Sequence, residues 1–510
     1  MGSHHLPVIS IFILLVNIAN SQLIETKLLP DDAHPNHSFG FSVAMDSVHA
    51  VIGAYIDTID GAYSGSAYVF KRNGLIWEQE RKIVPDIIED HGEFGFSVAV
   101  KGNDILIGKR EDTEKGSWSG AVYWYQYNDG STWIKKKKIM ASDEQIGDYF
   151  GTSIAISGEY AIIGATGVNG ETNNDGAAYI FQKKDSSWEE KYKIIPDSLV
   201  GEAYFGHAVD IDGDWAIIGA YSDDELERDA GAAYLYQRID TSWVFNKKLR
   251  RSDTDNGHDF GYSVAISGEY AAVGEISVSG YAGFVYVYKY DSGENTWHEC
   301  ACLTDTSVDY AIYYGYSISL DGDYLAVGVP EDETIGNRAG ALFLYKRIED
   351  DWVLLKKVYA SDGGETDYLG RSTFLYGDYV ICGVPRYAIG DTISSGIAYL
   401  YSGISELTDI NQLSLLAPGE FYLDQNYPNP FNAITVIRYT VGAQNLVPLQ
   451  HVHLSIYNIL GQKVATLVNK KQPAGDYKVE WDASGFASGV YLYRLQAGDH
   501  VQTKKMIYMK

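Results

Sequence analysis

Residues 150–195 read FGTSIAISGEYAIIGATGVNGETNNDGAAYIFQKKDSSWEEKYKII, and the architecture of most of the chain can be worked out from them. Gly151 follows an aromatic residue, Gly164 comes thirteen residues later, and Gly176 opens a run of apolar and aromatic residues. Short apolar stretches separated by turn residues are typical of β-strands. The sequence here predicts four strands, at residues 152–156, 160–165, 177–182 and 188–195.

The same markers recur in seven units along the chain. The first glycine and its preceding residue are found at Phe39-Gly40, Phe94-Gly95, Phe150-Gly151, Phe205-Gly206, Phe260-Gly261, Tyr314-Gly315 and Leu369-Gly370. In six units the fourth strand begins at a tryptophan: Trp77, Trp133, Trp188, Trp243, Trp297 and Trp352. Seven repeats of four strands predict an all-β fold, a seven-bladed β-propeller with four strands per blade.

The two ends of the repeated region predict how the ring closes. The seventh unit stops after its third strand, residues 397–401, and an isolated strand, residues 23–29, precedes the first unit. We expect the N-terminal strand to complete the last blade, because closure leaves no strand edge exposed. In the first strand of each unit, small residues alternate with larger aliphatic ones, so both faces are expected to be buried between neighbouring sheets.

The motifs of these units resemble a known family. Phe94-Gly-Phe-Ser-Val-Ala99, Ile162-Ile-Gly-Ala165 and Gly176-Ala-Ala-Tyr-Ile-Phe181 are similar to the FG-GAP repeat of integrin α-subunits and bacterial surface proteins. The resemblance spans residues 23 to about 402 and implies a propeller. The integrin-type calcium loop lies between the first two glycine markers, where this chain has only tight turns such as 157–159. No metal ligand and no cofactor is therefore predicted.

Charge and the N-terminal segment indicate where the protein works. The 510 residues include 40 basic and 68 acidic ones, a formal net charge of −28, which argues against binding to nucleic acid or to anionic lipid. Residues 8–18 are apolar but too few to span a bilayer as a helix, and small residues follow at 19–21. Residues 1–21 are thus predicted to be a signal peptide and the mature chain to lack a transmembrane segment. Three cysteines, Cys300, Cys302 and Cys382, are predicted to be buried and unpaired.

The remaining chain is predicted to form two further segments. The propeller should occupy residues 22–402, a linker 403–420, and a small Ig-like β-sandwich 421–510. The expected strands of the sandwich are 436–441, 452–457, 463–468, 475–481, 489–497 and 501–508. An Ig-like accessory module is one interpretation of this segment.

Its motifs support a second interpretation, because they resemble the type A C-terminal sorting domain of the type IX secretion system. The residues that carry the resemblance are Asn429, Pro430, Phe431, Asn432, Gly461, Gly489, Tyr491, Lys504 and Lys505. The resemblance implies export across the outer membrane, interaction with the secretion machinery, and removal of the domain during attachment or release.

The long loops of the repeats are rich in acidic residues, and loops on a rigid scaffold commonly carry binding sites. Candidate binding residues after the second strands are Asp57, Asp60, Asp112, Glu171, Asp175, Asp223, Asp224, Asp229, Glu331, Asp332 and Glu333. An acidic face could bind a cation or a basic ligand, or simply keep an exported protein in solution. The loop at 223–229 has the densest carboxylates, but it lacks a calcium-loop register, so we expect only weak cation attraction there.

Two classes of function remain open. No catalytic motif is found in the sequence, and His207, three residues before Asp210, fits a half-buried strand residue better than a catalytic one. The sequence favours a secreted or cell-surface binding or adhesion propeller whose ligand is an extracellular protein or glycan. The alternative is an extracellular hydrolase or lyase acting on polysaccharide or protein from the central channel. Convergence of acid–base residues at the channel would favour the enzyme.

Overall fold

The computed structural model describes residues 23–509 apart from 129–131, 171–173, 198, 226–228, 252–257, 277–282, 306–312, 390–393, 408–421, 424–425, 427–428, 430, 442–449, 473–474 and 498–499. The predicted signal peptide and most of the predicted linker lie outside these residues. The chain divides into two compact units between Leu407 and Thr408. Apart from one 3-10 turn, η1 (Ile404–Glu406), the described elements are all strands, and none of the described helical structure could cross a membrane.

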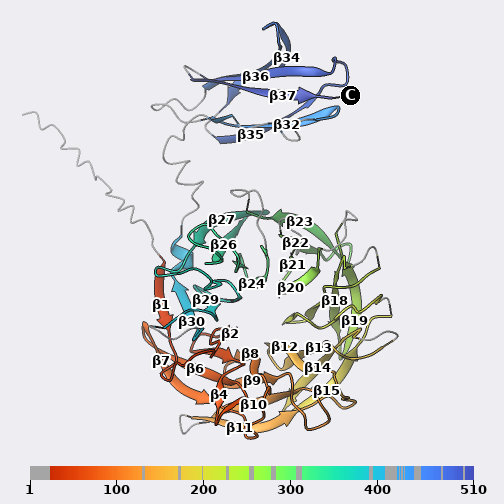
Figure 1. Cartoon of the computed structure of the whole chain (residues 1–510). Coiled ribbons are helices and arrows are strands. Elements are labelled where there is room, and N and C mark those ends of the chain that lie inside the picture. Colours follow the sequence, from red (N-terminus) through yellow and green to blue (C-terminus); the bar gives the residue numbers. More distant parts are fainter. Residues whose placement is uncertain are drawn as a thin grey trace, which may run out of the picture. The chain divides into compact units, whose positions relative to one another are not determined.

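The first unit is a ring of four-stranded antiparallel sheets (Figure 1). From the innermost to the outermost strand, they are β2 (Ser42–Met45), β3 (His49–Ala54), β6 (Ser66–Asn73), β7 (Ile76–Ile83); β8 (Phe94–Lys101), β9 (Asp104–Lys109), β10 (Ala121–Asn128), β11 (Thr132–Ile139); β12 (Phe150–Ser157), β13 (Tyr160–Ala165), β14 (Ala177–Lys184), β15 (Ser187–Ile194); β16 (Val209–Asp212), β17 (Trp215–Ala220), β18 (Ala232–Ile239), β19 (Ser242–Leu249); β20 (Phe260–Ser267), β21 (Tyr270–Glu275), β22 (Phe284–Asp291), β23 (Thr296–Leu303); β24 (Ser317–Asp321), β25 (Tyr324–Val329), β26 (Ala341–Ile348), β27 (Asp351–Val358); and β28 (Ser372–Tyr376), β29 (Tyr379–Val384), β30 (Ile397–Ser402), β1 (Ile24–Leu28). A two-stranded hairpin, β4 (Thr58–Ile59) and β5 (Ala62–Tyr63), follows β3.

The N-terminal strand closes this ring, as the sequence predicts. β1 pairs antiparallel with β30, from Ile24 opposite Ser402 to Leu28 opposite Ala398. The first and last sheets also meet at the axis, where the Ser372 hydroxyl donates a 2.9 Å hydrogen bond to the Gly40 carbonyl. The two ends of the repeated region are therefore held by both an outer strand pair and an inner hydrogen bond.

The same inner hydrogen bond links neighbouring sheets around the axis. A serine two residues after the first marker glycine donates to the carbonyl of the next marker glycine, at 2.6 to 2.9 Å, in the pairs Ser42–Gly95, Ser97–Gly151, Ser153–Gly206, Ser263–Gly315 and Ser317–Gly370. The sheet that begins with β16 has Ala208 at this position. The small residues of the first strands thus face the next sheet, whereas Val43 and Met45 pack with Leu28 and Leu400 of the preceding one.

Close approach of these sheets explains the second marker glycine. A Cβ atom on Gly164 would lie 1.9 Å from the carbonyl oxygen of Gly206 in the next sheet, and one on Gly383 would lie 1.8 Å from that of Gly40. No side chain fits between backbones at this distance, so glycine is required at the point where each sheet meets its neighbour.

Substitution of this glycine is expected to open the contact between two sheets. Gly164→Ala should lower the free energy of unfolding by at least about 3 kcal/mol, because the clashing atom is backbone and cannot turn aside. Gly336→Ala is the matched control, since its nearest neighbour would be 3.5 Å away, and should change the value by less than about 0.5 kcal/mol. Urea unfolding of both variants measures the difference, and equal midpoints would contradict this account.

The second unit has two sheets around one core. A three-stranded sheet contains β31 (Tyr422–Leu423), β32 (Ile434–Val441) and β35 (Gly475–Asp482), and a four-stranded sheet contains β34 (Lys463–Gln472), β33 (Gln450–Asn458), β36 (Gly489–Ala497) and β37 (His500–Tyr508). Ile437 and Trp481 of the first sheet pack with Leu454 and Tyr493 of the second. The six predicted strands are all present, and the sequence missed only β31.

The prediction of three buried cysteines is wrong for two of them. Cys382 is buried, but Cys300 and Cys302 are exposed on β23, which is the outermost strand of its sheet. Outermost strands pack against the ring on one face only, so residues two apart can share the solvent face.

Candidate functional site

Most of the repeated acidic loop residues are not part of a solvated acidic face. Asp57, Asp112, Asp175, Asp223 and Asp332 are all less than 9% exposed. Four of them form ion pairs with a lysine of the outermost strand in the same sheet, namely Lys82–Asp57, Lys138–Asp112, Lys248–Asp223 and Lys357–Asp332, at 2.5 to 2.9 Å. These carboxylates tie the loop after the second strand to the sheet, which corrects the prediction that they form an exposed binding surface.

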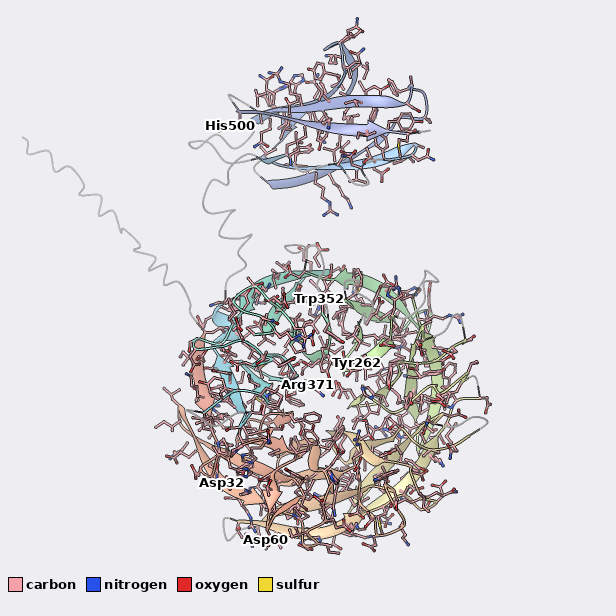
Figure 2. The ribbon with its side chains drawn as sticks, viewed as in Figure 1. Asp32, Asp60, Tyr262, Trp352, Arg371 and His500 are labelled. Carbon is pink, nitrogen blue, oxygen red and sulfur yellow. The ribbon has the colours of Figure 1, made fainter. Side chains whose placement is uncertain are left out.

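The other predicted acidic residues remain accessible to different degrees. Asp60 and Glu333 are exposed, Asp224, Asp229 and Glu331 are half-buried, and Glu171 lies outside the described residues. In Figure 2, Asp60 lies at the rim of the ring, far from Arg371 and Tyr262 near the axis. In the carboxylate-rich loop after β17, Lys248 pairs with both Asp223 and Glu225 and so neutralises part of its charge. The expectation of weak cation attraction there stays a prediction.

Removing one lysine should show that these pairs are structural. Lys138→Met should cost about 3–5 kcal/mol of unfolding free energy, because the charge of Asp112 would be left buried without its partner. The double variant Asp112→Asn/Lys138→Met should recover much of this loss. Lys191→Met breaks a solvent-accessible pair with Glu189 and should leave the unfolding midpoint unchanged. A small effect of Lys138→Met would argue that Asp112 is hydrated.

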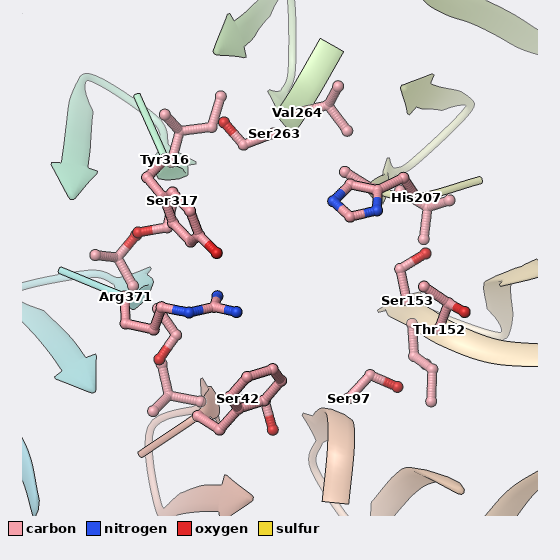
Figure 3. Close-up of a pocket in the computed structure, with 18 of the residues that line it drawn as sticks. Ser42, Ser97, Thr152, Ser153, His207, Ser263, Val264, Tyr316, Ser317 and Arg371 are labelled. Carbon is pink, nitrogen blue, oxygen red and sulfur yellow. The ribbon is translucent and has the colours of Figure 1, made fainter. Parts of the chain in front are cut away.

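A cavity of about 280 Å³ lies on the axis of the ring, which we call the axial cavity. It is lined by the start of every innermost strand, and the residue directly after each first marker glycine lies in its wall: Phe41, Phe96, Thr152, His207, Tyr262, Tyr316 and Arg371. Figure 3 shows Arg371 and His207 pointing into it from opposite sides. Of these residues, the sequence analysis considered only His207. The available signal was that this position is neither consistently small nor consistently aliphatic.

Aromatic rings hold the cationic side chain of this cavity. The Arg371 guanidinium lies 4.4 Å from the ring centre of Phe41 and 4.6 Å from that of Tyr316. The Tyr262 hydroxyl donates a 3.0 Å hydrogen bond to the Tyr316 hydroxyl, and the His207 ring packs 4.8 Å from that of Tyr262. Burial, together with the charge of Arg371, lowers the pKa of His207 to about 4, so the imidazole is neutral at pH 7.

A second cavity of about 360 Å³ shares Tyr262, Tyr316 and Arg371 with the first. We call it the tyrosine cavity, because it also includes Tyr313 and Tyr368, together with Asp259, Ile276, Pro330 and Glu331. Burial, with the nearby charge of Asp229, raises the pKa of Asp259 to about 7. The Glu331 carboxylate lies 3.5 Å from the Arg338 guanidinium. The two cavities form one region of aromatic faces with a guanidinium and two carboxyl groups.

The other titratable residue of interest, Asp210, does not join this region. It lines a separate cavity of about 170 Å³ formed by later residues of the innermost strands. Its carboxylate accepts 2.8 Å hydrogen bonds from the backbone N–H groups of Ile211 and Ile266, and burial raises its pKa to about 6. His207 and Asp210 therefore belong to different cavities, despite their spacing in sequence.

A histidine cluster that the sequence analysis missed could in principle hold a metal ion. The ligand atoms of His34, His37 and Asp57 all lie within 4.8 Å of one another. Asp57 already accepts a 2.5 Å hydrogen bond from Ser66 and pairs with Lys82 at 2.8 Å. An ammonium group at this distance opposes a bound cation, so the cluster is explained as part of the anchoring of its loop.

The structure places the predicted sorting residues within the second unit. Phe431 is 2% exposed, packs against Tyr508, and pairs with the last strand through a 3.0 Å bond from its N–H to the Ile507 carbonyl. Asn429 accepts a hydrogen bond from the Ile507 N–H, and Tyr491 is buried. Gly461 occupies a turn with φ 75°, Gly489 begins β36, Asn432 and Lys505 are exposed, Lys504 is half-buried, and Pro430 lies outside the described residues.

These features define a class of protein: an all-β propeller with a ligand-sized aromatic region on its axis, joined to a small two-sheet domain. The chain belongs to the FG-GAP repeat family, whose repeats match residues 24–70, 77–125, 133–181, 188–236, 243–288 and 297–345. Each matched repeat begins in one outermost or closing strand and ends in the third strand of the following sheet. Residues 425–509 match the secretion system C-terminal sorting domain, which marks a secreted or surface protein of the type IX route.

Solved structures with a similar fold are distant in sequence. The acylaminoacyl peptidase of Pyrococcus horikoshii, uncomplexed and in an orthorhombic crystal form, is 8% and 9% identical with TM-scores of 0.41 and 0.43. Each comparison covers 82% of this chain and 59% of the peptidase, so the chain spans well under two thirds of that protein. The β-propeller domain of the Trilobed protease from Pyrococcus furiosus is 9% identical with a TM-score of 0.40, covering 67% of this chain and 90% of that one. No curated protein matches the chain.

Proposed function

We propose that the protein is a non-enzymatic binding or adhesion propeller of the cell surface or surroundings, with its ligand site at the axial and tyrosine cavities. In this proposal the four-stranded sheets are the blades of a closed seven-bladed propeller. The second unit is an Ig-like sorting domain that interacts with the type IX secretion machinery. The ligand is an extracellular protein or glycan.

One observation carries the assignment to binding. The framework residues of the repeats are used up in contacts between sheets, whereas the residue after each first marker glycine varies and reaches the axial cavity. No carboxylate is among the described residues that line this cavity, and His207 is neutral at pH 7. Aromatic faces and a guanidinium on a rigid scaffold suit recognition better than acid–base chemistry.

Binding to surfaces is the direct test. The purified protein, labelled with a fluorophore away from the ring axis, should bind saturably to intact cells and extracellular polysaccharide of the producing bacterium. Unlabelled protein should displace it, whereas the same amount of an unrelated acidic protein should not. Linear, non-saturable retention on every surface would refute a specific binding function.

One feature favours an enzyme as the second candidate. Asp259 and Glu331 line the tyrosine cavity together, and with a pKa of about 7 Asp259 retains its proton near neutral pH, as a general acid requires. An enzyme should release new chain ends from the bound polysaccharide or protein, and Asp259→Asn should stop the release without abolishing binding. Release that depends on Asp259 would replace the binding proposal with this one.

A further inference from the structure

We infer that the axial and tyrosine cavities together bind a carboxylate-bearing sugar, such as a uronic acid unit, and that the Arg371 guanidinium recognises its carboxylate. This inference rests on the proposed binding function and gives the ligand a chemical class. The axial cavity supplies the cation, and the tyrosine cavity supplies the surface on which the sugar ring lies.

Arg371 is unusual among the arginines of this acidic protein. Arg110, Arg238 and Arg347 each pair with a carboxylate, namely Glu93, Asp214 and Asp323. Within the part of the chain that the structure describes, no carboxylate lies within ion-pair distance of Arg371. A half-buried guanidinium without an anion is costly, and its planar fork matches a carboxylate.

The aromatic packing preorganises this group. Phe41 and Tyr316 each present a ring to the guanidinium, at 4.4 and 4.6 Å, and the side chain projects into the cavity as Figure 3 shows. A guanidinium held over ring faces keeps its edge N–H groups available for hydrogen bonds. Because His207 opposite is neutral, Arg371 provides the full positive charge within the axial cavity at pH 7.

The tyrosine cavity favours a sugar over an acidic peptide. Its four tyrosines offer flat faces against which the C–H face of a pyranose can pack, and the Asp259 and Glu331 carboxyl groups can accept bonds from sugar hydroxyls. The same carboxyl groups would repel the further acidic side chains of an acidic peptide once they are ionised. A neutral sugar, in turn, would leave Arg371 without a partner. A ring that carries both hydroxyls and one carboxylate satisfies both cavities.

Paired saccharides test the inference. The purified full chain is titrated with uronate-containing oligosaccharides and with the same oligosaccharides after reduction of their carboxyl groups, with poly-glutamate as the peptide probe. At least one uronate oligosaccharide should bind about tenfold or more tightly than its reduced form, the effect expected of one charge-assisted contact. Arg371→Met should remove this preference.

The matched control is Arg72→Met, which removes a guanidinium stacked 4.6 Å from the Tyr379 ring but away from both cavities, and it should bind as the wild type does. If Arg371→Met fails to fold, competition by free glucuronate but not by glucose in the wild-type protein gives the same answer. Equal binding of each saccharide pair, Arg371-dependent binding of poly-glutamate alone, or no saccharide binding at all would overturn the inference. Because the cell-binding assay assumes no ligand class, those results would leave the proposed function standing.

Discussion

A chain that lacks residues 23–29 should lose most of its folding stability. The deletion removes β1, so the outermost strand of the last sheet is missing and β30 is left with an open edge. It also removes the buried Leu28 side chain from the core shared with Phe39 and Ile52, and the Lys27–Asp362 ion pair. Loss of Leu28 packing alone is worth about 2–5 kcal/mol, so removal of the whole strand should consume most of a typical folding free energy of about 5–15 kcal/mol.

Denaturant unfolding of the purified first unit within the full chain, followed by tryptophan fluorescence, measures this effect. Leu28→Ala and Leu29→Ala form a matched pair, because Leu28 is 1% exposed and Leu29 is 39% exposed. The first should lower the midpoint clearly, and the second should not. A deletion variant with an unchanged midpoint would mean that β1 does not close the ring.

Loss of the second unit should abolish export. A chain that ends at Leu407 keeps the first compact unit but lacks residues 425–509, the match to the sorting domain. We expect it to be retained inside the outer membrane, whereas the full chain reaches the surface or the medium. Phe431→Ala should have a similar effect because Phe431 is buried against Trp481 and Tyr508, while Asn432→Ala at an exposed neighbour should be exported normally.

Fractionation of cells that express each variant, with mass spectrometry of the surface form, decides this prediction. The mature protein should begin near Gln22 and end near the predicted linker before Phe421. Intact Lys510 on most surface molecules would contradict removal of the domain, and normal export of the truncated chain would contradict its sorting role.

The architecture was largely predictable from the sequence because each repeat encodes its own contacts. Gly164 and its equivalents mark backbone contacts between sheets, and the missing fourth strand of the last unit left one position for β1 to fill. The hairpin β4–β5 and the short strand β31 were not predicted, because two-residue strands carry no periodic signal.

The candidate site was harder to predict, for a physical reason. Acidic loops such as that of Asp112 look like an exposed charged surface in sequence, since nothing there shows that Lys138, on the outermost strand, reaches back to neutralise it. Conversely, Phe41 and Arg371 are 330 positions apart, and only closure of the ring brings them into contact. A repeat pattern identifies equivalent positions, but it does not show which of them line one cavity.

The most direct test of the account is whether binding occurs at the axis or at the acidic rim. Thr152→Tyr places at one wall of the axial cavity the residue type that Tyr262 and Tyr316 provide at the equivalent positions, so the framework should accept it while the cavity is partly filled. Asp60→Asn/Glu333→Gln removes two exposed loop carboxylates instead. In the saturable cell-surface assay, we predict that Thr152→Tyr weakens binding at least about tenfold, a loss of about 1.4 kcal/mol, and that the double rim variant binds as the wild type does. Full binding by Thr152→Tyr, with loss in the rim variant, would contradict the account.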